Sequence, residues 1–155
     1  MIDINRNIKK LGLEIPAPIK PLANYAPFVR SNKLIFISGQ IPIRNNVLEF
    51  SGKLGRDLNI SEGKKAAELC IINTLSILKD ILEGDLNKLS KCIRLSVYIN
   101  SIETFYDQPA IADGASNIIK ELFLENGEHT RSAVGANSLP KNAAVEIDSI
   151  FELSN

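Results

Sequence analysis

The sequence has few of the residues on which metal and disulfide chemistry usually depends. Its 155 residues include two cysteines and one histidine. Cys70 and Cys92 do not form a CxxC pair, and two cysteines are too few for a disulfide framework, so we expect two buried, reduced thiols. The single histidine, His129, cannot form a histidine-based metal site. We expect it on the surface between a helix and a strand, and we expect no metal.

An excess of charge of either sign is also absent. Eighteen basic and eighteen acidic side chains cancel, so no overall field attracts nucleic acid or anionic lipid. No apolar run approaches the roughly 20 residues that span a bilayer. Residues 1–10 contain no apolar stretch of signal-peptide length. The cytoplasm is therefore the expected location.

Motifs of several large functional classes are missing as well. The glycine-bearing basic segment 52–56 lacks the spacing of a phosphate-binding loop, and it does not open the next helix directly. Aromatic residues in the pattern of RNA-binding strands do not occur either. No nucleophile elbow accompanies His129. Nucleotide hydrolysis, RNA binding and a serine-type triad are therefore poorly supported.

Helical periodicity is present in three places. Apolar residues spaced by three and four predict a short helix over 3–11 and a long one beginning after Ser61, the expected N-cap, and ending before Gly84. A second long helix has its apolar stripe over 111–123, with Pro109 near its first turn and Gly127 after its end. Both long helices have broad apolar stripes, which indicates packing against a sheet.

Strand patterns fill most of the remaining chain. Residues 34–38 are apolar on both faces, so this strand should be central and covered on both sides. Residues 92–99 alternate between apolar and polar side chains. Weaker strand signals, and the pair of runs near the C-terminus, lie at 24–29, 47–50, 131–135 and 144–151.

The order of these elements predicts one α+β domain over residues 1–155. We expect a mixed six-stranded sheet with the two long helices on one face. Residues 1–21 should form an N-terminal arm, because Pro16, Pro18 and Pro21 exclude helix and central strand. The second face of the sheet must be solvated or covered by another subunit, and the absence of a polar face on 34–38 favours a homo-oligomer.

Two charged residues interrupt the apolar C-terminal strands. Arg131 could bind the carboxylate of a small ligand through its planar fork, or it could form a structural salt bridge. Glu146 could orient or deprotonate a water molecule, or it could lie on a solvated strand face. If the two strands paired directly, these residues would be about 13 Å apart. An intervening strand or a second subunit would change that register.

Three further residues are candidates for binding a ligand. Gly39 follows Ser38 at the end of the buried strand and would allow a ligand close to the backbone, although the pair could simply end the strand. Tyr25 could offer its hydroxyl to a ligand or serve only in packing.

These segments together resemble the reactive intermediate deaminase (Rid/YjgF) family. The resemblance is carried by NYAP at 24–27, LIFISGQIP at 34–42, RSAV at 131–134, LPK at 139–141 and VEI at 145–147. It covers about residues 22–153. The N-terminal arm, segment 44–59 and segment 107–116 resemble a longer branch of the family.

The resemblance implies a chorismate-mutase-like fold and a homotrimer with clefts between subunits. It implies hydrolysis of 2-imino or 2-enamino acids to 2-keto acids and ammonia, without metal or organic cofactor. In this chain Arg131 would hold the substrate carboxylate and Glu146 the attacking water. The residues lining the cleft would be Tyr25, Ser38, Gly39 and Ala133. Ala133 stands where many members carry cysteine, so only its backbone N–H could contribute, and the helix asparagine of some members has only Ser116 or Asn117 nearby.

Two other functions fit parts of this pattern. A non-catalytic trimer that senses a small carboxylate metabolite would need Arg131 but not Glu146. A ribonuclease is sometimes attached to the family name, but the neutral net charge and the missing stacking platforms argue against it.

Overall fold

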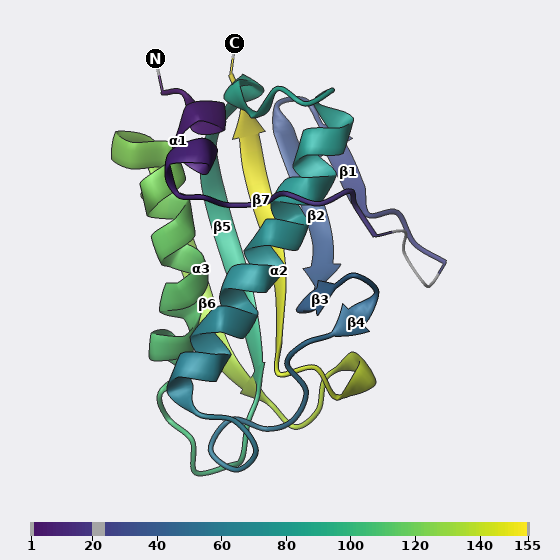
Figure 1. Cartoon of the computed structure of the whole chain (residues 1–155), viewed down its shortest axis with the longest axis vertical. Helices are drawn as coiled ribbons and strands as arrows, with labels where there is room; N and C mark the ends of the chain where they lie inside the picture. Colours follow the sequence, from purple (N-terminus) through teal and green to yellow (C-terminus); the bar gives the residue numbers. More distant parts are fainter. Residues whose placement is uncertain (1, 20–23, 155) are drawn as a thin grey trace.

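The computed structural model describes residues 2–19 and 24–154 as two layers, a sheet and the helices that cover one of its faces (Figure 1). The sheet has five strands in the order β1-β2-β7-β5-β6. In chain order these strands are β1 (Phe28–Ser31), β2 (Leu34–Gln40), β5 (Leu89–Asn100), β6 (Thr130–Ala136) and β7 (Val145–Leu153). The α-helices are α1 (Ile4–Lys10), α2 (Ile60–Ile81) and α3 (Gln108–Phe123). Short 3-10 helices occur at Leu86–Lys88, Leu124–Asn126 and Pro140–Asn142.

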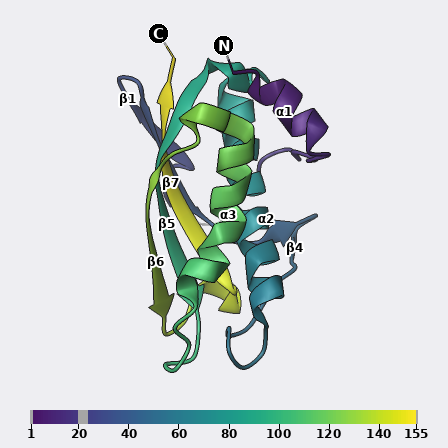
Figure 2. The same ribbon diagram turned by 90° about the vertical axis from the view of Figure 1, so that its left-hand side faces the viewer.

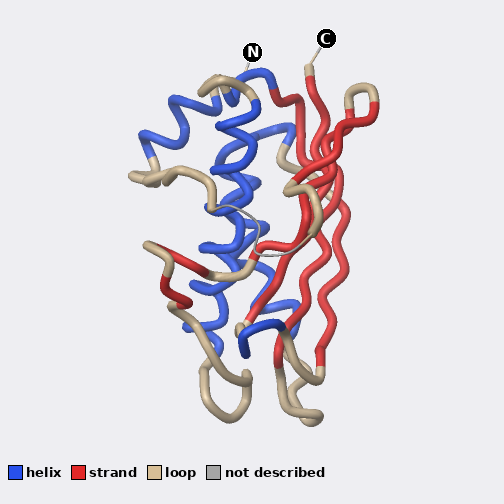
Figure 3. Tube along the Cα trace, turned by 90° about the vertical axis from the view of Figure 1, so that its right-hand side faces the viewer, coloured by secondary structure: helices blue, strands red, loops and turns tan. Residues whose placement is uncertain are grey.

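The prediction of a single six-stranded sheet was wrong. The segment expected near 47–50 is β4 (Val47–Leu48), which pairs with β3 (Ile43–Arg44) in a separate ribbon on the helix side (Figure 3). Asn45 and Asn46 both have positive φ, which is the backbone geometry of a two-residue turn between the strands of a hairpin. The side chain of Asn73 in α2 donates to the carbonyls of Ile41 and Ile43, which fixes this hairpin to the helix.

The two faces of the sheet differ strongly in exposure. Along β7, buried and half-buried residues alternate, and Val145 and Ile147 are fully buried in the core beneath α2. The opposite face carries no helix (Figure 2). In β2, Ile35 and Ile37 are buried but Phe36 is 41% exposed, so within one chain this strand is covered on only one side. The expected cover of its second side would have to come from another subunit.

β5 lies between β7 and β6, the two strands that carry Glu146 and Arg131. β5 pairs antiparallel with β7 on one side and parallel with β6 on the other, and α3 is the crossover that makes the parallel pairing possible. β1, expected over 24–29, begins only at Phe28, after Pro27, and forms one edge of the sheet. β6 forms the other edge.

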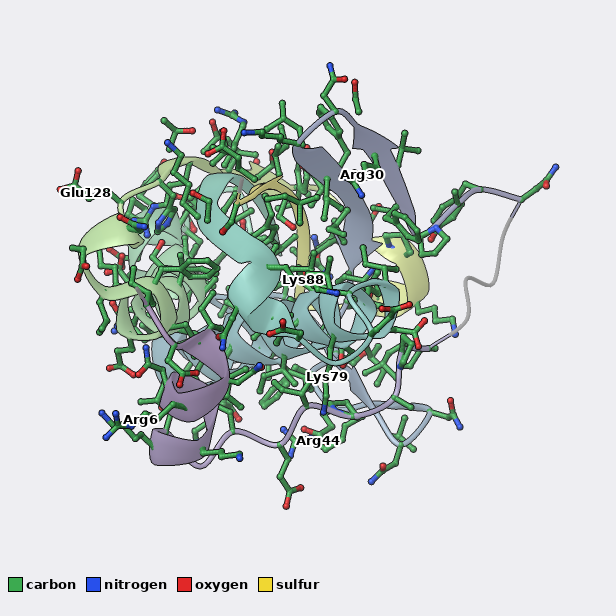
Figure 4. All side chains as sticks on the ribbon, turned by 90° about the horizontal axis from the view of Figure 1, so that it is seen from above. Arg6, Arg30, Arg44, Lys79, Lys88 and Glu128 are labelled. Atoms are coloured by element: carbon green, nitrogen blue, oxygen red, sulfur yellow. The ribbon has the colours of Figure 1, made fainter. Side chains whose placement is uncertain are left out.

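The N-terminal segment packs against the helices, and Ile4 is buried in the core. Asp3 caps α1 by accepting the N–H of Arg6, and the Asn7 side chain donates to the Leu122 carbonyl of α3. Residues 11–19 then cross the outer side of α2 (Figure 4). Residues 1, 20 and 21 of the expected arm lie outside the described residues.

The start of α2 differs from its expected position. The N-cap is Asn59, not Ser61, because the Asn59 side chain accepts the Glu62 N–H at 2.9 Å while the Glu62 carboxylate accepts the Asn59 N–H at 2.8 Å. This reciprocal pair is a capping box, and it satisfies two backbone donors at the end of the helix.

Replacing the cap should weaken the fold without disturbing the site. Asn59→Ala should lower the free energy of unfolding by about 1 kcal/mol, because the Glu62 N–H loses its acceptor. Urea denaturation measures the change, and Asn59→Asp, which keeps an acceptor oxygen, should retain most of the stability. Equal losses in both variants would contradict the role assigned to the cap.

Candidate functional site

Arg131 lies on β6, at the edge of the sheet, and points toward α3. Its register partner in β5 is Leu95, a fully buried core residue, so both side chains leave the sheet on the helix side. The Arg131 Nη1 group donates to Asp113 Oδ1 at 2.8 Å and to Ser116 Oγ at 2.9 Å, and Nη2 donates to the Pro109 carbonyl at 3.2 Å. Three oxygen atoms of α3 therefore fix the guanidinium.

These contacts leave part of the guanidinium open to a ligand. An arginine carries five N–H donors, and the three described contacts use three of them, so two remain. The Arg131 side chain is 25% exposed, and that of Asp113 is 49% exposed. Part of the guanidinium is therefore accessible, and an anion bound there would lie next to the carboxylate of Asp113.

Ser116, which accepts a hydrogen bond from Arg131, is itself hydrogen-bonded to His129. Ser116 Oγ lies 2.8 Å from His129 Nε2, and His129 Nδ1 lies 2.8 Å from the Gly127 carbonyl. A carbonyl only accepts, so we infer that Nδ1 carries a proton, and in the tautomer with Nε2 unprotonated that nitrogen accepts the Ser116 hydroxyl proton. Ser116 can then accept from Arg131. His129 is thus half-buried in this network and not the surface residue expected from the sequence.

Glu146 lies on the opposite face of the sheet, on β7. It alternates with the buried Val145 and Ile147, is itself half-buried, and has Tyr98 of β5 as its register partner. Burial raises the pKa of its carboxyl above the usual 4.5, and the negative charge of Asp148 raises it further. Such a carboxylate accepts a proton more readily than an exposed one.

Gly39 and Ser38 adjoin this carboxylate at the end of β2. A Cβ added at Gly39 would collide with Glu146 Oε1 and lie 3.0 Å from Glu146 Cδ, so only glycine leaves room for the side chain as it stands. Ser38 Oγ donates to the Ala26 carbonyl at 2.7 Å, which ties down the segment containing Tyr25. The Tyr25 residue is 54% exposed.

The candidate residues therefore form two groups, not one. We call Arg131 and Ala133 the edge half-site; Ala133 lies two residues along β6 on the same side, opposite the buried Val97. We call Tyr25, Ser38, Gly39 and Glu146 the face half-site. β5 separates β6 from β7, and the two half-sites lie on opposite faces of the sheet, so within one chain Arg131 and Glu146 do not line a common pocket.

A cleft of about 310 Å³ opens near the edge half-site, at the C-terminal ends of β5 and β6. Its lining includes Ser101, Tyr106, Gln108 and Gly135. Gln108 directly precedes Pro109, whose carbonyl accepts from Arg131. A Cβ at Gly135 would lie 2.9 Å from Ser101 Oγ, so glycine keeps this cleft open.

Asp113 and the contact of Ser116 with Arg131 were not expected from the sequence. Their signal was a polar pair at i and i+3 on α3, beside the apolar stripe that packs on the sheet. That spacing shows that the two side chains lie on the same side of the helix. It does not show which residues they contact. Only the crossover geometry of α3 over β6 brings them to Arg131.

Neither a metal-binding cluster nor a membrane-spanning helix occurs among the described residues. Over residues 2–19 and 24–154, no group of three or more His, Cys, Asp and Glu side chains is arranged to hold a metal ion. Across the same part of the chain, no helix has the length and apolar character needed to cross a bilayer.

Comparison with known proteins gives a consistent picture. Residues 5–153 match the family model described as "YjgF/chorismate_mutase-like, putative endoribonuclease". Protein TCP17 of Trypanosoma cruzi is 38% identical over 150 residues, covering 96% of this chain and 93% of its own. A 2-iminobutanoate/2-iminopropanoate deaminase of Dermatophagoides farinae is 30% identical over 89% of this chain and 92% of its own. A solved structure of unknown function from Agrobacterium tumefaciens is 40% identical, with a TM-score of 0.90 over 97% of this chain and 92% of its own.

The ionisation of Glu146 should respond to Asp148 in a defined direction. Asp148→Asn should lower the Glu146 pKa, yet leave it above 4.5, because burial is the larger cause of the shift. Titration of carbon-13-labelled carboxyl groups by NMR measures it. Glu152→Gln, farther along β7, is the matched control and should leave the Glu146 pKa unchanged.

The same shift fixes the sign of a stability effect. A folded-state pKa above the unfolded value means that the contribution of Glu146 to stability is full below pH 4.5 and is lost as the pH rises through the folded-state pKa.

A Glu146 pKa that rises or stays constant in Asp148→Asn would contradict the assigned cause.

Proposed function

The chain belongs to the YjgF family of chorismate-mutase-like proteins, and from this premise we propose that it hydrolyses 2-imino and 2-enamino acids to 2-keto acids and ammonia. The Dermatophagoides relative named as an imine deaminase supports this reaction. We propose the cytoplasm as its location, in keeping with two buried cysteines that form no disulfide among the described residues.

The proposed reaction needs few catalytic groups from the protein. The carbon of a protonated imine is already electrophilic, so the main tasks are to hold the substrate and to place a water molecule beside it. Arg131 would bind the substrate carboxylate with its two remaining N–H donors. Glu146, with its raised pKa, would take a proton from the attacking water.

The observation that carries the proposal is the division of these residues into two half-sites. Each half-site is partly exposed, and each lacks the group that the other supplies. The edge half-site of one copy can complete the face half-site of a second copy. In a closed ring the same contact repeats around the symmetry axis, and a homotrimer would form three equivalent sites.

The surface of the open face supports burial by a second copy. Phe36, Tyr98 and Val134 are large side chains on this face of β2, β5 and β6, and each is more than a third exposed. The outer edge of β6 also presents backbone groups that pair with no strand among the described residues. Both features favour contact between copies.

The sensor and the ribonuclease remain distinguishable alternatives. A sensor would bind a carboxylate through Arg131 and would have no turnover to lose in Glu146→Gln. A ribonuclease, the activity in the description of the family model, would need to attract RNA with a formal net charge of zero. Cleavage of RNA that depends on Glu146 would favour it.

Single variants test the residues first. Arg131→Ala should reduce kcat/KM for an imino acid generated in situ by about 100-fold, since charge-assisted hydrogen bonds to the carboxylate are lost. Glu146→Gln should lower kcat and leave binding of a 2-keto acid nearly unchanged. Ammonia release measures turnover. Full turnover in Arg131→Ala would contradict the proposal.

Mixing the two variants tests whether the site is shared. In a random mixture of Arg131→Ala and Glu146→Gln subunits, about a quarter of the wild-type activity should return, since one intact arginine meets one intact glutamate at one interface in four. The mixture is made by joint refolding, and light scattering gives the oligomeric state. The double variant is the control and should stay inactive. A mixture that remains inactive after exchange would show that the sites are not shared.

A further inference from the structure

We propose that Asp113 makes the edge half-site selective for a zwitterionic ligand, namely a 2-iminium acid whose carboxylate lies on Arg131 and whose cationic nitrogen lies on Asp113. The inference rests on the proposed function and adds a residue that determines specificity. It also defines the protonation state in which the substrate binds.

The geometry of the ion pair leaves both partners accessible. Asp113 contacts Arg131 through one oxygen only, Oδ1 on Nη1 at 2.8 Å. Among the described residues, no other donor contacts the Asp113 side chain, which is about half exposed. Arg131 keeps two N–H donors. An open anion and an open cation thus lie side by side at the surface of the half-site.

This arrangement suits a ligand that carries its two charges on groups attached to neighbouring carbon atoms. In a 2-iminium acid the carboxylate carbon is bonded directly to the C=N carbon, so its negative and positive groups are neighbours, as the Arg131 and Asp113 side chains are. A zwitterion can therefore pair with both residues at once. A 2-keto acid has only the negative group, so its carboxylate would lie beside the carboxylate of Asp113 with no positive group of its own to offset the repulsion.

The selectivity bears on the reaction itself. Protonation of the imine makes its carbon electrophilic, and Asp113 would favour the protonated form. Water then adds its oxygen to this carbon while the C=N electron pair moves to nitrogen, and Glu146 takes one proton from the water and passes it to that nitrogen. The C–N bond breaks and its electron pair leaves with ammonia, while an electron pair of the hydroxyl oxygen forms the C=O bond. The ammonia takes up the hydroxyl proton and leaves as NH4⁺. The balance is R–C(=NH2⁺)–CO2⁻ + H2O → R–C(=O)–CO2⁻ + NH4⁺. The keto product lacks the cation, so it loses its contact with Asp113 and is released.

The surroundings of the pair leave space for the rest of the substrate. Pro109, which accepts from Arg131, follows Gln108 at the rim of the 310 Å³ cleft. The substrate side chain can extend toward Gly135, where the absence of a Cβ keeps the cleft open. Ser116 and His129 hold the guanidinium from the other side, so Arg131 need not move when Asp113 changes partners.

Binding of two ligands of equal size tests the inference. Alanine is the zwitterionic probe, and pyruvate carries the carboxylate without the cation. Calorimetric titration of the wild-type protein should show tighter binding of alanine. Asp113→Asn should shift the ratio of the two dissociation constants by about tenfold toward pyruvate, because the neutral amide neither attracts the ammonium group nor repels the carboxylate.

Control variants separate the possible outcomes. Glu121→Gln removes an exposed carboxylate elsewhere on α3 and should leave the ratio unchanged. Equal weakening of both ligands in Asp113→Asn would mean that Asp113 merely holds Arg131 in place, and would overturn the inference. Thermal unfolding checks that each variant is folded.

Arg131→Ala distinguishes failure of the inference from failure of the proposed function. Loss of both ligands in Arg131→Ala together with an unchanged ratio in Asp113→Asn would sink the inference alone. Undiminished binding of both ligands in Arg131→Ala, or no binding of either by the wild-type protein, would overturn the proposed function as well.

Discussion

The contact between the Arg131 guanidinium and three oxygen atoms of α3 is the constraint on which the site depends. It holds a charged side chain at the edge of the sheet, where the core alone would not keep it. The contact exists because β6 follows α3 in a parallel crossover, so that the strand returns directly beneath the helix. The same crossover brings Ser116 and His129 together behind the guanidinium.

The sheet determines how the remaining groups relate to this arginine. β5 lies between β6 and β7, and side chains alternate between the two faces along each strand. Arg131 pairs with Leu95 and Glu146 pairs with Tyr98, three residues farther along β5, so Glu146 faces away from the helices while Arg131 faces toward them. A single chain thus presents a cation at one edge and a carboxylate on the open face. Chemistry that needs both groups requires two copies of the chain, and the exposed aromatic side chains of the open face are suited to such a contact.

Much of this fold could be read from the sequence, because its long elements have clear periodicity. The alternation in β7 and the broad stripe of α2 both give correct elements, and the segments that resemble the Rid/YjgF family locate the relevant strands. Too many strands were assigned to the main sheet, because the residues of β3 and β4 are ordinary strand residues. The separation of this hairpin from the main sheet depends on the turn at Asn45 and Asn46 and on the hydrogen bonds from Asn73. Those determinants are contacts and backbone angles that no periodicity reveals.

Candidate residues for a site could be chosen from the sequence, but their arrangement could not. Gly39 was expected to allow close approach, and the group that approaches it within the chain is the carboxylate of Glu146. The structural salt bridge weighed for Arg131 is present, with Asp113 as its partner, and it leaves donors available. Whether a charged strand residue binds protein or ligand depends on the helix packed above it, and sequence spacing along one strand cannot supply that.

A crystal structure of the protein grown with a 2-keto or 2-amino acid would test the central claim most directly. The account predicts a ligand carboxylate on the free donors of Arg131, with Glu146 of a neighbouring copy on the far side of the same ligand. A ligand bound elsewhere, or an Arg131 edge that faces solvent in the assembled protein with no second copy against it, would contradict the account.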